Sequence, residues 1–248
     1  MSLLSDLDFQ YNWRYEFKYR LTLQQYLQVI NACQPFVQPD PFTKAVPAMK
    51  YLVRSLYFDS LDYQTYNEKN GGNQSRMKYR IRTYNTLLQS DSVIRVELKF
   101  REGVRTGKHG KIISAGAFTH FMKRYHWHCE PDPVLIEFER QLHARILRPK
   151  VLVEYFREGY ISRRREDLRI TFDHHVQSAQ TKMLFPGQAF FRQHHPHQII
   201  LEIKCHDKQP DWLKKIVETH KLKIESNSKY CQGIEITQLD FVNHALRV

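Results

Sequence analysis

Three short segments of the chain place a lysine two residues after a glutamate, and a fourth alternates cationic with apolar or aromatic side chains. The pairs are Glu16 with Lys18, Glu97 with Lys99 and Glu202 with Lys204, and the fourth segment is Lys78-Tyr-Arg-Ile-Arg-Thr-Tyr84. Successive side chains of a β-strand point to opposite faces, so Lys78, Arg80 and Arg82 share one face. That face is either open to water, as in many antiparallel sheets, or lies opposite an anionic group. Arginine and lysine are the usual partners of phosphate, and a nearby carboxylate can take a divalent cation.

The composition also favours an anionic partner. The 248 residues include 38 Lys and Arg against 26 Asp and Glu, which gives a formal net charge of +12. The sign alone does not choose between nucleic acid, a phosphorylated metabolite, another polyanion and a membrane surface. Aromatic residues are plentiful, but they alternate into the expected core and form no exposed stacking pattern for single-stranded nucleic acid.

The cysteines and the hydropathy pattern bear on the compartment. Cys33, Cys129, Cys205 and Cys231 lie far apart without a Cys-x-x-Cys pair, so we expect a reduced, cytoplasmic chain. The dipeptides His128-Cys129 and Cys205-His206 lack the paired spacing of a structural zinc site. No signal-like start and no run of about 18 apolar residues is found, so we expect no membrane segment in this chain, and a membrane partner stays open.

Periodicity predicts an α+β protein. Period-two alternation predicts strands over residues 14–19, 53–58, 78–84, 94–100, 105–113, 151–160, 168–178 and 198–204. Helical spacing predicts helices over 23–33, 62–69, 115–128, 133–147 and 211–220, and a last one from about residue 226. We expect a hairpin connection over 85–92 and loops over 35–41, where three prolines fall, and over 194–197.

The charged faces differ from a merely solvated sheet. Their charged positions are Lys, Arg and Glu, with little Ser, Thr or Gln, and the opposite faces are apolar enough to be covered by the amphipathic helices. A sheet that closes on itself turns such a face into a lumen. The acidic residues are too few to compensate the cations there, and a bound polyphosphate would supply the difference. We therefore expect a closed antiparallel β-barrel tunnel with a charged lumen and helices packed outside.

Eight ordered elements resemble a known family. They are Glu16-Phe-Lys-Tyr19, Leu56-Tyr-Phe-Asp59, Lys78-Tyr-Arg-Ile-Arg-Thr-Tyr84, Glu97-Leu-Lys99, Tyr155-Phe-Arg157, Arg169-Ile-Thr-Phe-Asp173, Glu202-Ile-Lys204 and Ser228-Lys-Tyr230. Their order and spacing resemble the VTC domain, the polyphosphate polymerase module of the vacuolar transporter chaperone complex, within the triphosphate tunnel metalloenzyme superfamily. The resemblance spans roughly residues 9–242 and implies a single domain over 1–248. The sequence shows no added SPX or membrane module like those of the eukaryotic proteins.

The resemblance implies a role for each matching residue. Those expected to act on phosphate as catalytic residues are Lys18, Arg80, Arg82, Lys99, Arg157, Arg169 and Lys229. Further substrate-binding positions are Glu16, Lys78, Glu97, Lys111 and Lys204, with Lys108 as the competitor of Lys111. Glu202 is expected to hold Mn²⁺ or Mg²⁺.

Three functions remain open on the sequence. The first, which the resemblance favours, is metal-dependent transfer of the γ-phosphate of ATP to a growing polyphosphate chain with release of ADP. The second is hydrolysis of inorganic triphosphate or a nucleoside triphosphate, and the third is non-enzymatic binding of a polyanion. We expect ATP or another triphosphate and polyphosphate as partners, and no sequence-specific nucleic acid. The pair His174-His175 and the 194–197 cluster are expected to be solvated, and the basic turn 163–165 either is solvated or guides an anionic chain.

Overall fold

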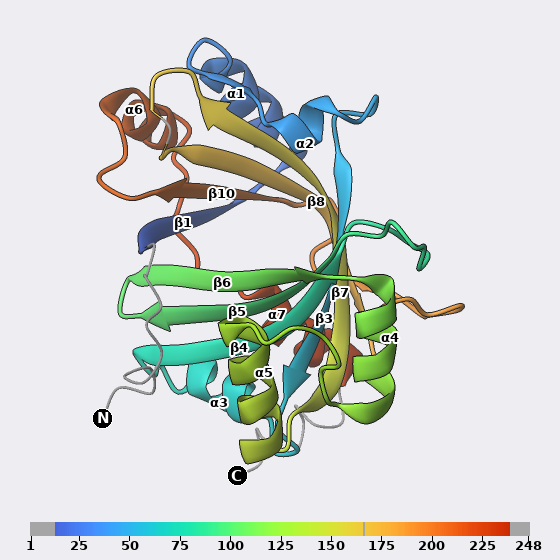
Figure 1. Cartoon of the computed structure of the whole chain (residues 1–248). Helices are drawn as coiled ribbons and strands as arrows, with labels where there is room; N and C mark the ends of the chain where they lie inside the picture. Colours follow the sequence, from blue (N-terminus) through green and yellow to red (C-terminus); the bar gives the residue numbers. More distant parts are fainter. Residues whose placement is uncertain (1–12, 166, 239–248) are drawn as a thin grey trace. The chain divides into compact units, whose positions relative to one another are not determined.

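The computed structural model describes residues 13–165 and 167–238, and its strands belong to one sheet (Figure 1). The hydrogen-bonded strand order is β2-β7-β3-β4-β5-β6-β1-β10-β8-β9, and β7 also pairs with β8. The strand order from β7 through β8 is therefore closed, with β2 and β9 as additional strands. The predicted fold class, a closed antiparallel β-barrel with helices, is confirmed.

The described residues divide into two compact units, which we describe separately. Unit 1 contains Arg54–Leu152 and Thr181–Gly187, and unit 2 contains Arg14–Val53, Val153–Gln180 and the chain from Gln188 onward. The ends of the expected domain core, residues 9–12 and 239–242, lie outside the described residues.

Unit 1 is built on an antiparallel meander covered by helices on its apolar face. Its elements are most of β3 (Tyr51–Asp59), α3 (Gln64–Asn70), β4 (Ser75–Thr83), β5 (Ile94–Glu102), β6 (Arg105–Ile113), α4 (Ala115–Arg124), α5 (Pro133–Ala144) and the start of β7 (Arg148–Ser162). Phe138 of α5 has no exposed surface and lies edge-on to Phe58 and Tyr79, with ring centroids 5.3 and 6.1 Å apart. Burying one such aromatic side chain stabilises the fold by about 1.5–3 kcal/mol. The helices therefore hold the apolar face, as the alternation predicted.

Unit 2 follows the same plan with other helices. Its elements are β1 (Arg14–Leu21), α1 (Leu23–Cys33), β2 (Val37–Pro39), α2 (Pro41–Lys44), the rest of β7, β8 (Arg169–Ala179), β9 (Arg192–Gln193), β10 (Ile199–Cys205), α6 (Asp211–Thr219) and α7 (Lys229–Thr237). One apolar cluster joins Leu21, Phe172 and Leu201 from the strands to Val29 of α1 and Leu213 of α6. Thr22 caps α1 through a capping box with Gln25.

The differences from the predicted elements are local. The 35–41 segment contains β2 and leads into α2, whose Asp40 N-cap and following Pro41 start a helical turn where a loop was expected. The helix predicted over 115–128 ends at Arg124, because Tyr125 takes the left-handed conformation as its C-cap. Strand β9 was not predicted and has only two residues.

Two further predictions concern the cysteines and the membrane. All four cysteines lie within the described residues, and each is a free thiol. No helix in the described part of the chain is long and apolar enough to cross a membrane.

Candidate functional site

The charged face of unit 1 is set by the register of four strands. Arg80 of β4 lies opposite Tyr57 of β3 on one side and Glu97 of β5 on the other, and Lys78 lies opposite Lys99. In β6, Lys108 lies opposite Lys99. Cross-strand partners share a face, so this register places Glu97 among cations from both neighbouring strands.

Ion pairs around Glu97 define what we call the Glu97 cluster, which consists of Arg80, Arg82, Glu97 and Lys108. Arg80 donates through Nε and Nη2 to Glu97 Oε2, both at 2.7 Å. Lys108 Nζ lies 3.1 Å from Glu97 Oε1, and Arg82 Nη1 lies 3.8 Å from Oε2. The Glu97 side chain has no exposed surface. One buried carboxylate therefore faces three cations.

The cluster changes the proton affinities of its members. Burial alone would raise the pKa of Glu97, but Arg80, Arg82 and Lys108 hold it well below its usual value, so Glu97 stays ionised. Burial lowers the pKa of Lys108 to about 8, although Glu97 opposes that shift and the two arginines add to it. Tyr57 is buried, yet the positive charges of Arg80 and Arg82 lower the pKa of its phenol to about 8.

Strand β3 supplies two contacts that the sequence did not point to. Arg80 Nη1 donates to Tyr57 Oη at 2.9 Å, and Arg82 Nε donates to Ser55 Oγ at 3.0 Å. Both hydroxyls precede the charged segment by more than 20 residues, and only the register Tyr57↔Arg80 and Ser55↔Arg82 reveals them. The signal available in the sequence was the two-residue spacing of Ser55 and Tyr57, which places both on the polar face of β3.

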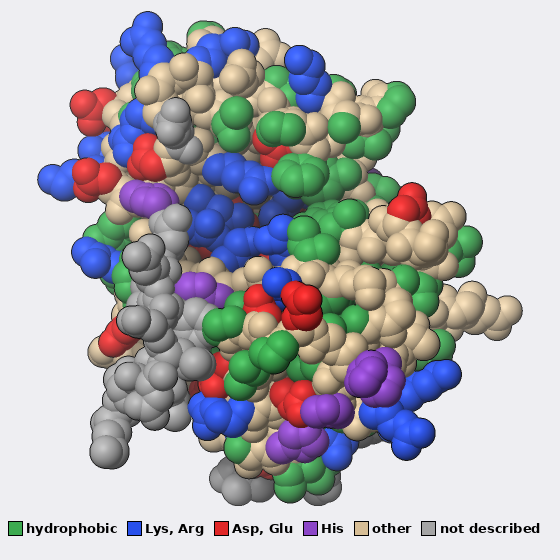
Figure 2. Space-filling view, viewed as in Figure 1, with side chains coloured by type: hydrophobic (Ala, Val, Ile, Leu, Met, Phe, Trp, Pro, Cys, Tyr) green, Lys and Arg blue, Asp and Glu red, His purple; other side chains and the backbone are tan. Residues whose placement is uncertain are grey.

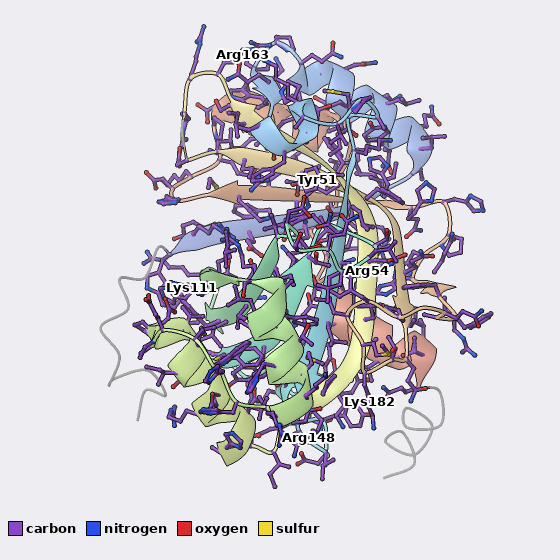
Figure 3. All side chains as sticks on the ribbon, turned by 45° about the vertical axis from the view of Figure 1, so that its right-hand side comes forward. Tyr51, Arg54, Lys111, Arg148, Arg163 and Lys182 are labelled. Carbon is purple, nitrogen blue, oxygen red and sulfur yellow. The ribbon has the colours of Figure 1, made fainter. Side chains whose placement is uncertain are left out.

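Lys111 lies apart from this cluster. It is opposite Val96 in the register, on the face that carries the core, and its Nζ lies 3.1 Å from Asp132 Oδ2 at the start of α5 (Figure 3). Lys108 is three positions away and so points to the other face. Of the two lysines weighed from the sequence, Lys108 therefore joins Glu97, and the expectation for Lys111 is corrected.

On the charged face of unit 2, acidic residues of one strand lie opposite basic residues of the next. Glu16 of β1 lies opposite Lys204 of β10, and Lys18 lies opposite Glu202. Lys204 Nζ lies 2.8 Å and Lys18 Nζ 3.5 Å from oxygens of Glu202, and Lys18 also lies 3.9 Å from Glu16. Each lysine of this pair of strands therefore has a carboxylate neighbour.

Asp173 of β8 joins two further predicted site residues. Arg157 of β7 donates to both of its oxygens, through Nε at 2.6 Å and Nη2 at 2.8 Å, and Lys229 Nζ at the start of α7 lies 2.6 Å from Oδ2. Arg157 Nη2 also reaches Glu202 Oε2 at 3.4 Å. We call Lys18, Arg157, Asp173, Glu202, Lys204 and Lys229 the Glu202 cluster. Asp173 ended a motif of the sequence but was not predicted as a site residue.

In the Glu202 cluster, the pKa of each group depends on its burial and on the charged groups beside it. Burial alone would raise the pKa of Asp173, but Arg157 and Lys229 lower it below its usual value. Burial would lower the pKa of Lys229, but Asp173 and Tyr155 raise it, so Lys229 stays charged. Burial lowers the pKa of Lys204 well below its usual value although Glu202 opposes the shift.

Arg169 lies at the border of this face. Its Cα partner is Lys204, and its Nη2 donates to Asp40 Oδ2 at 2.6 Å and to Tyr51 Oη at 3.2 Å. Arg169 is thus held by the short segment between β2 and α2, where the sequence predicted only a loop.

Metal binding by protein groups alone has no support in the described residues. They contain no group of three or more His, Cys, Asp or Glu side chains arranged for an ion. Mg²⁺ and Mn²⁺ need only one or two carboxylates when phosphate oxygens and waters complete the shell. Glu202, with Glu16 on the adjacent strand and Lys18 near both, fits that kind of site.

The remaining candidates lie elsewhere. His174 is buried beside Glu158, with Nε2 and Oε2 3.1 Å apart, and His194 is buried between Ser178 and Gln232. These two histidines are therefore core groups, contrary to the expectation that they are solvated. Arg163 and Arg164 are exposed, whereas Arg165 pairs with Asp167. In the whole sequence, lysine and arginine outnumber aspartate and glutamate, which gives the net charge of +12. Figure 2 shows groups of Lys and Arg side chains, in blue, on the face that it draws.

Comparison with known proteins identifies the family and the fold. The model of the VTC domain family matches residues 13–238. The "putative adenylate cyclase" of Bacillus halodurans is similar in structure, with a TM-score of 0.52, 13% sequence identity, and 87% of this chain and 93% of that chain covered. The PH1819 protein of Pyrococcus horikoshii gives a TM-score of 0.46 at 13% identity, covering 90% of this chain and 98% of that one. A search of curated proteins gives no match.

Proposed function

Because the chain belongs to the VTC domain family, we propose that it is a metal-dependent phosphotransferase that extends polyphosphate from the γ-phosphate of ATP and releases ADP. In the reaction, a terminal oxygen of the chain attacks the γ-phosphorus, the bond from that phosphorus to the bridging oxygen breaks, and ADP leaves with the electron pair. Such a reaction needs positioning and positive charge more than covalent help from the protein.

The observation that carries the proposal is the register that gathers Arg80, Arg82 and Lys108 around Glu97. Lys78 and Lys99 extend the same face. Phosphate oxygens are the usual partners of such guanidinium and ammonium groups. In this proposal Arg80 and Arg82 hold phosphate oxygens, while Glu97 keeps the two guanidinium groups oriented.

The Glu202 cluster has a different role in the proposal. Lys18, Arg157 and Lys229 contact phosphate, and Asp173 holds the last two in place. Glu202 would hold Mn²⁺ or Mg²⁺, which withdraws charge from phosphate oxygens when it is bound. Glu16 and Lys204 flank Glu202 and set the electrostatic balance around it.

One assay tests the proposal against its rivals. The purified chain is incubated with ATP and Mn²⁺, and polymer, ADP and free phosphate are measured. ADP with polymer supports synthesis, free phosphate without polymer supports a triphosphatase, and neither product together with tight polyphosphate binding supports a binding protein. Arg80→Ala and Arg82→Ala should each abolish turnover, whereas Lys111→Ala is the matched control and should not. Full activity in either arginine variant would remove the central claim.

The metal role has its own test. Glu202→Gln keeps the size and hydrogen-bonding capacity of the side chain but removes its charge. Binding of Mn²⁺ in the presence of tripolyphosphate, measured by electron paramagnetic resonance of the free ion, should weaken at least tenfold in this variant. An unchanged Mn²⁺ titration would show that the ion binds elsewhere.

A further inference from the structure

Asp40 is a buried carboxylate that holds one of the predicted phosphate ligands. The residue is only 2% exposed. Its Oδ1 accepts a hydrogen bond from Thr43 N at 2.7 Å, which caps α2, and its Oδ2 accepts from Arg169 Nη2 at 2.6 Å. One side chain therefore both starts a helical turn and fixes an arginine 129 positions away.

The backbone fixes Asp40 in turn. Asp40 N donates to Gly159 O, and Gly159 N donates to Thr43 Oγ1, each at 2.8 Å. A Cβ atom on residue 159 would lie 2.2 Å from Asp40 Oδ2, so the carboxylate occupies space that only a glycine leaves. The position of Oδ2 is therefore set by Gly159 of β7 and Thr43 of α2, independently of Arg169.

Arg169 is anchored through Nη2, and its Nε is buried without a hydrogen-bond partner in the described part of the chain. Nη2 donates to Asp40 Oδ2 and to the Tyr51 hydroxyl, and burial raises the pKa of that tyrosine to about 12, so it stays neutral. Within residues 13–165 and 167–238, Nη1 has no hydrogen-bond partner, and Arg169 is 36% exposed at its side chain. Arg157 differs, because Asp173 takes its Nε and Nη2 together and only 8% of its side chain is exposed.

We propose that Asp40 is a positioning residue for Arg169, which it holds with the Nη1 edge directed at a phosphate oxygen of a triphosphate or polyphosphate. The inference rests on the proposed function and adds a residue that lies in none of the eight elements that carry the resemblance. Fixing the long side chain before binding removes an ordering cost that the ligand would otherwise meet. Simple charge counting predicts the opposite sign, since removal of an acidic residue beside Arg169 would strengthen anion binding.

The test uses the full chain, calorimetry with inorganic tripolyphosphate, and two variants. Asp40→Asn and Asp40→Ser both retain a good N-cap for α2. We expect each to fold with a thermal midpoint near that of the unmodified chain and to bind tripolyphosphate roughly 5- to 10-fold more weakly. In an Arg169→Ala background the same changes should have no further effect, because coupled residues are not additive.

A second readout needs no ligand. In the NMR spectrum of the unmodified chain labelled with ¹⁵N-arginine, hindered rotation of the Arg169 guanidinium should give distinct Nη signals. In Asp40→Asn these signals should coalesce because the group rotates more freely. Equal losses of affinity with and without Arg169, tighter binding in Asp40→Asn, or unchanged Arg169 signals would each overturn the inference. If instead the unmodified chain binds no tripolyphosphate while the signals respond as expected, the proposed function fails and the Asp40 contact to Arg169 stands, without its assigned purpose.

Discussion

The two units carry charged faces of different kinds on similar sheets. In the Glu97 cluster of unit 1, three cations meet one carboxylate with no exposed surface. In the Glu202 cluster of unit 2, four cations meet Glu202 and Asp173, and Glu16 and Asp40 pair with cations beside them. Cations gathered around one carboxylate can bind an anion, and carboxylates placed between cations hold those cations in fixed positions.

The difference shows in the protonation states. In unit 1 burial lowers the pKa of Lys108 to about 8, and the positive charges of Arg80 and Arg82 lower the pKa of Tyr57 to about 8. Lys108 is therefore close to losing its proton near physiological pH, and so is Tyr57. In unit 2, Asp173 raises the pKa of Lys229 and keeps it charged. We therefore expect the Glu97 cluster to change its charge near pH 8, whereas Asp173 keeps Lys229 charged over the same range.

The largest expected effect comes from removing the central carboxylate of unit 1. Glu97→Gln leaves the buried Arg80 and Arg82, and the partly exposed Lys108, without their counter-charge. Breaking a buried pair by removing one partner costs about 3–5 kcal/mol, so we expect the free energy of unfolding in urea to fall by that amount. The matched change in unit 2, Asp173→Asn, should cost less because Glu202 still lies near Arg157. Equal losses would contradict the distinction between the two clusters.

Some residues of the two clusters could be predicted from the sequence, and others could not. Alternation placed Arg80 and Arg82 on one face of their strand, and Glu97 and Lys99 on one face of the next, because period two is a local property of the chain. The partners Tyr57, Asp40 and Asp173 depend on which strands pair and in what register, and separations of 16 to 129 residues hide this from a local pattern. The 35–41 segment was missed for the same reason, since its turn is stabilised by the distant Gly159.

A smaller effect should appear on titration of the Glu97 cluster. Lys108 has a folded pKa of about 8 against a usual 10.5, so between those values the unfolded chain binds more protons than the folded one. The contribution of this group to the free energy of unfolding therefore rises with pH in that window. Anion binding has the opposite trend, because Lys108 loses its charge as pH rises through 8.

The titration has two matched variants. Tripolyphosphate affinity, measured by calorimetry from pH 7 to 9.5, should fall across the window in the unmodified chain and fall less in Lys108→Met. Tyr57→Phe removes the phenolate that forms over the same range, which separates its share of the decline. A decline that is unaltered in both variants would place the responsive group outside the Glu97 cluster.

The smallest expected effect concerns Lys111, and it sharpens the same comparison within one strand. Lys108 and Lys111 are three residues apart on β6, so the pleat sends them to opposite faces, one to Glu97 and the other to Asp132. The Lys111 side chain is 49% exposed, and exposed pairs of this kind contribute about 0–1 kcal/mol. Lys111→Ala should therefore leave tripolyphosphate affinity within twofold and stability within about 1 kcal/mol, whereas Lys108→Ala should weaken binding clearly. The reverse result, measured by calorimetry and urea unfolding, would mean that β6 pairs with β5 in a register shifted by one residue, because only such a shift exchanges the faces of the two lysines.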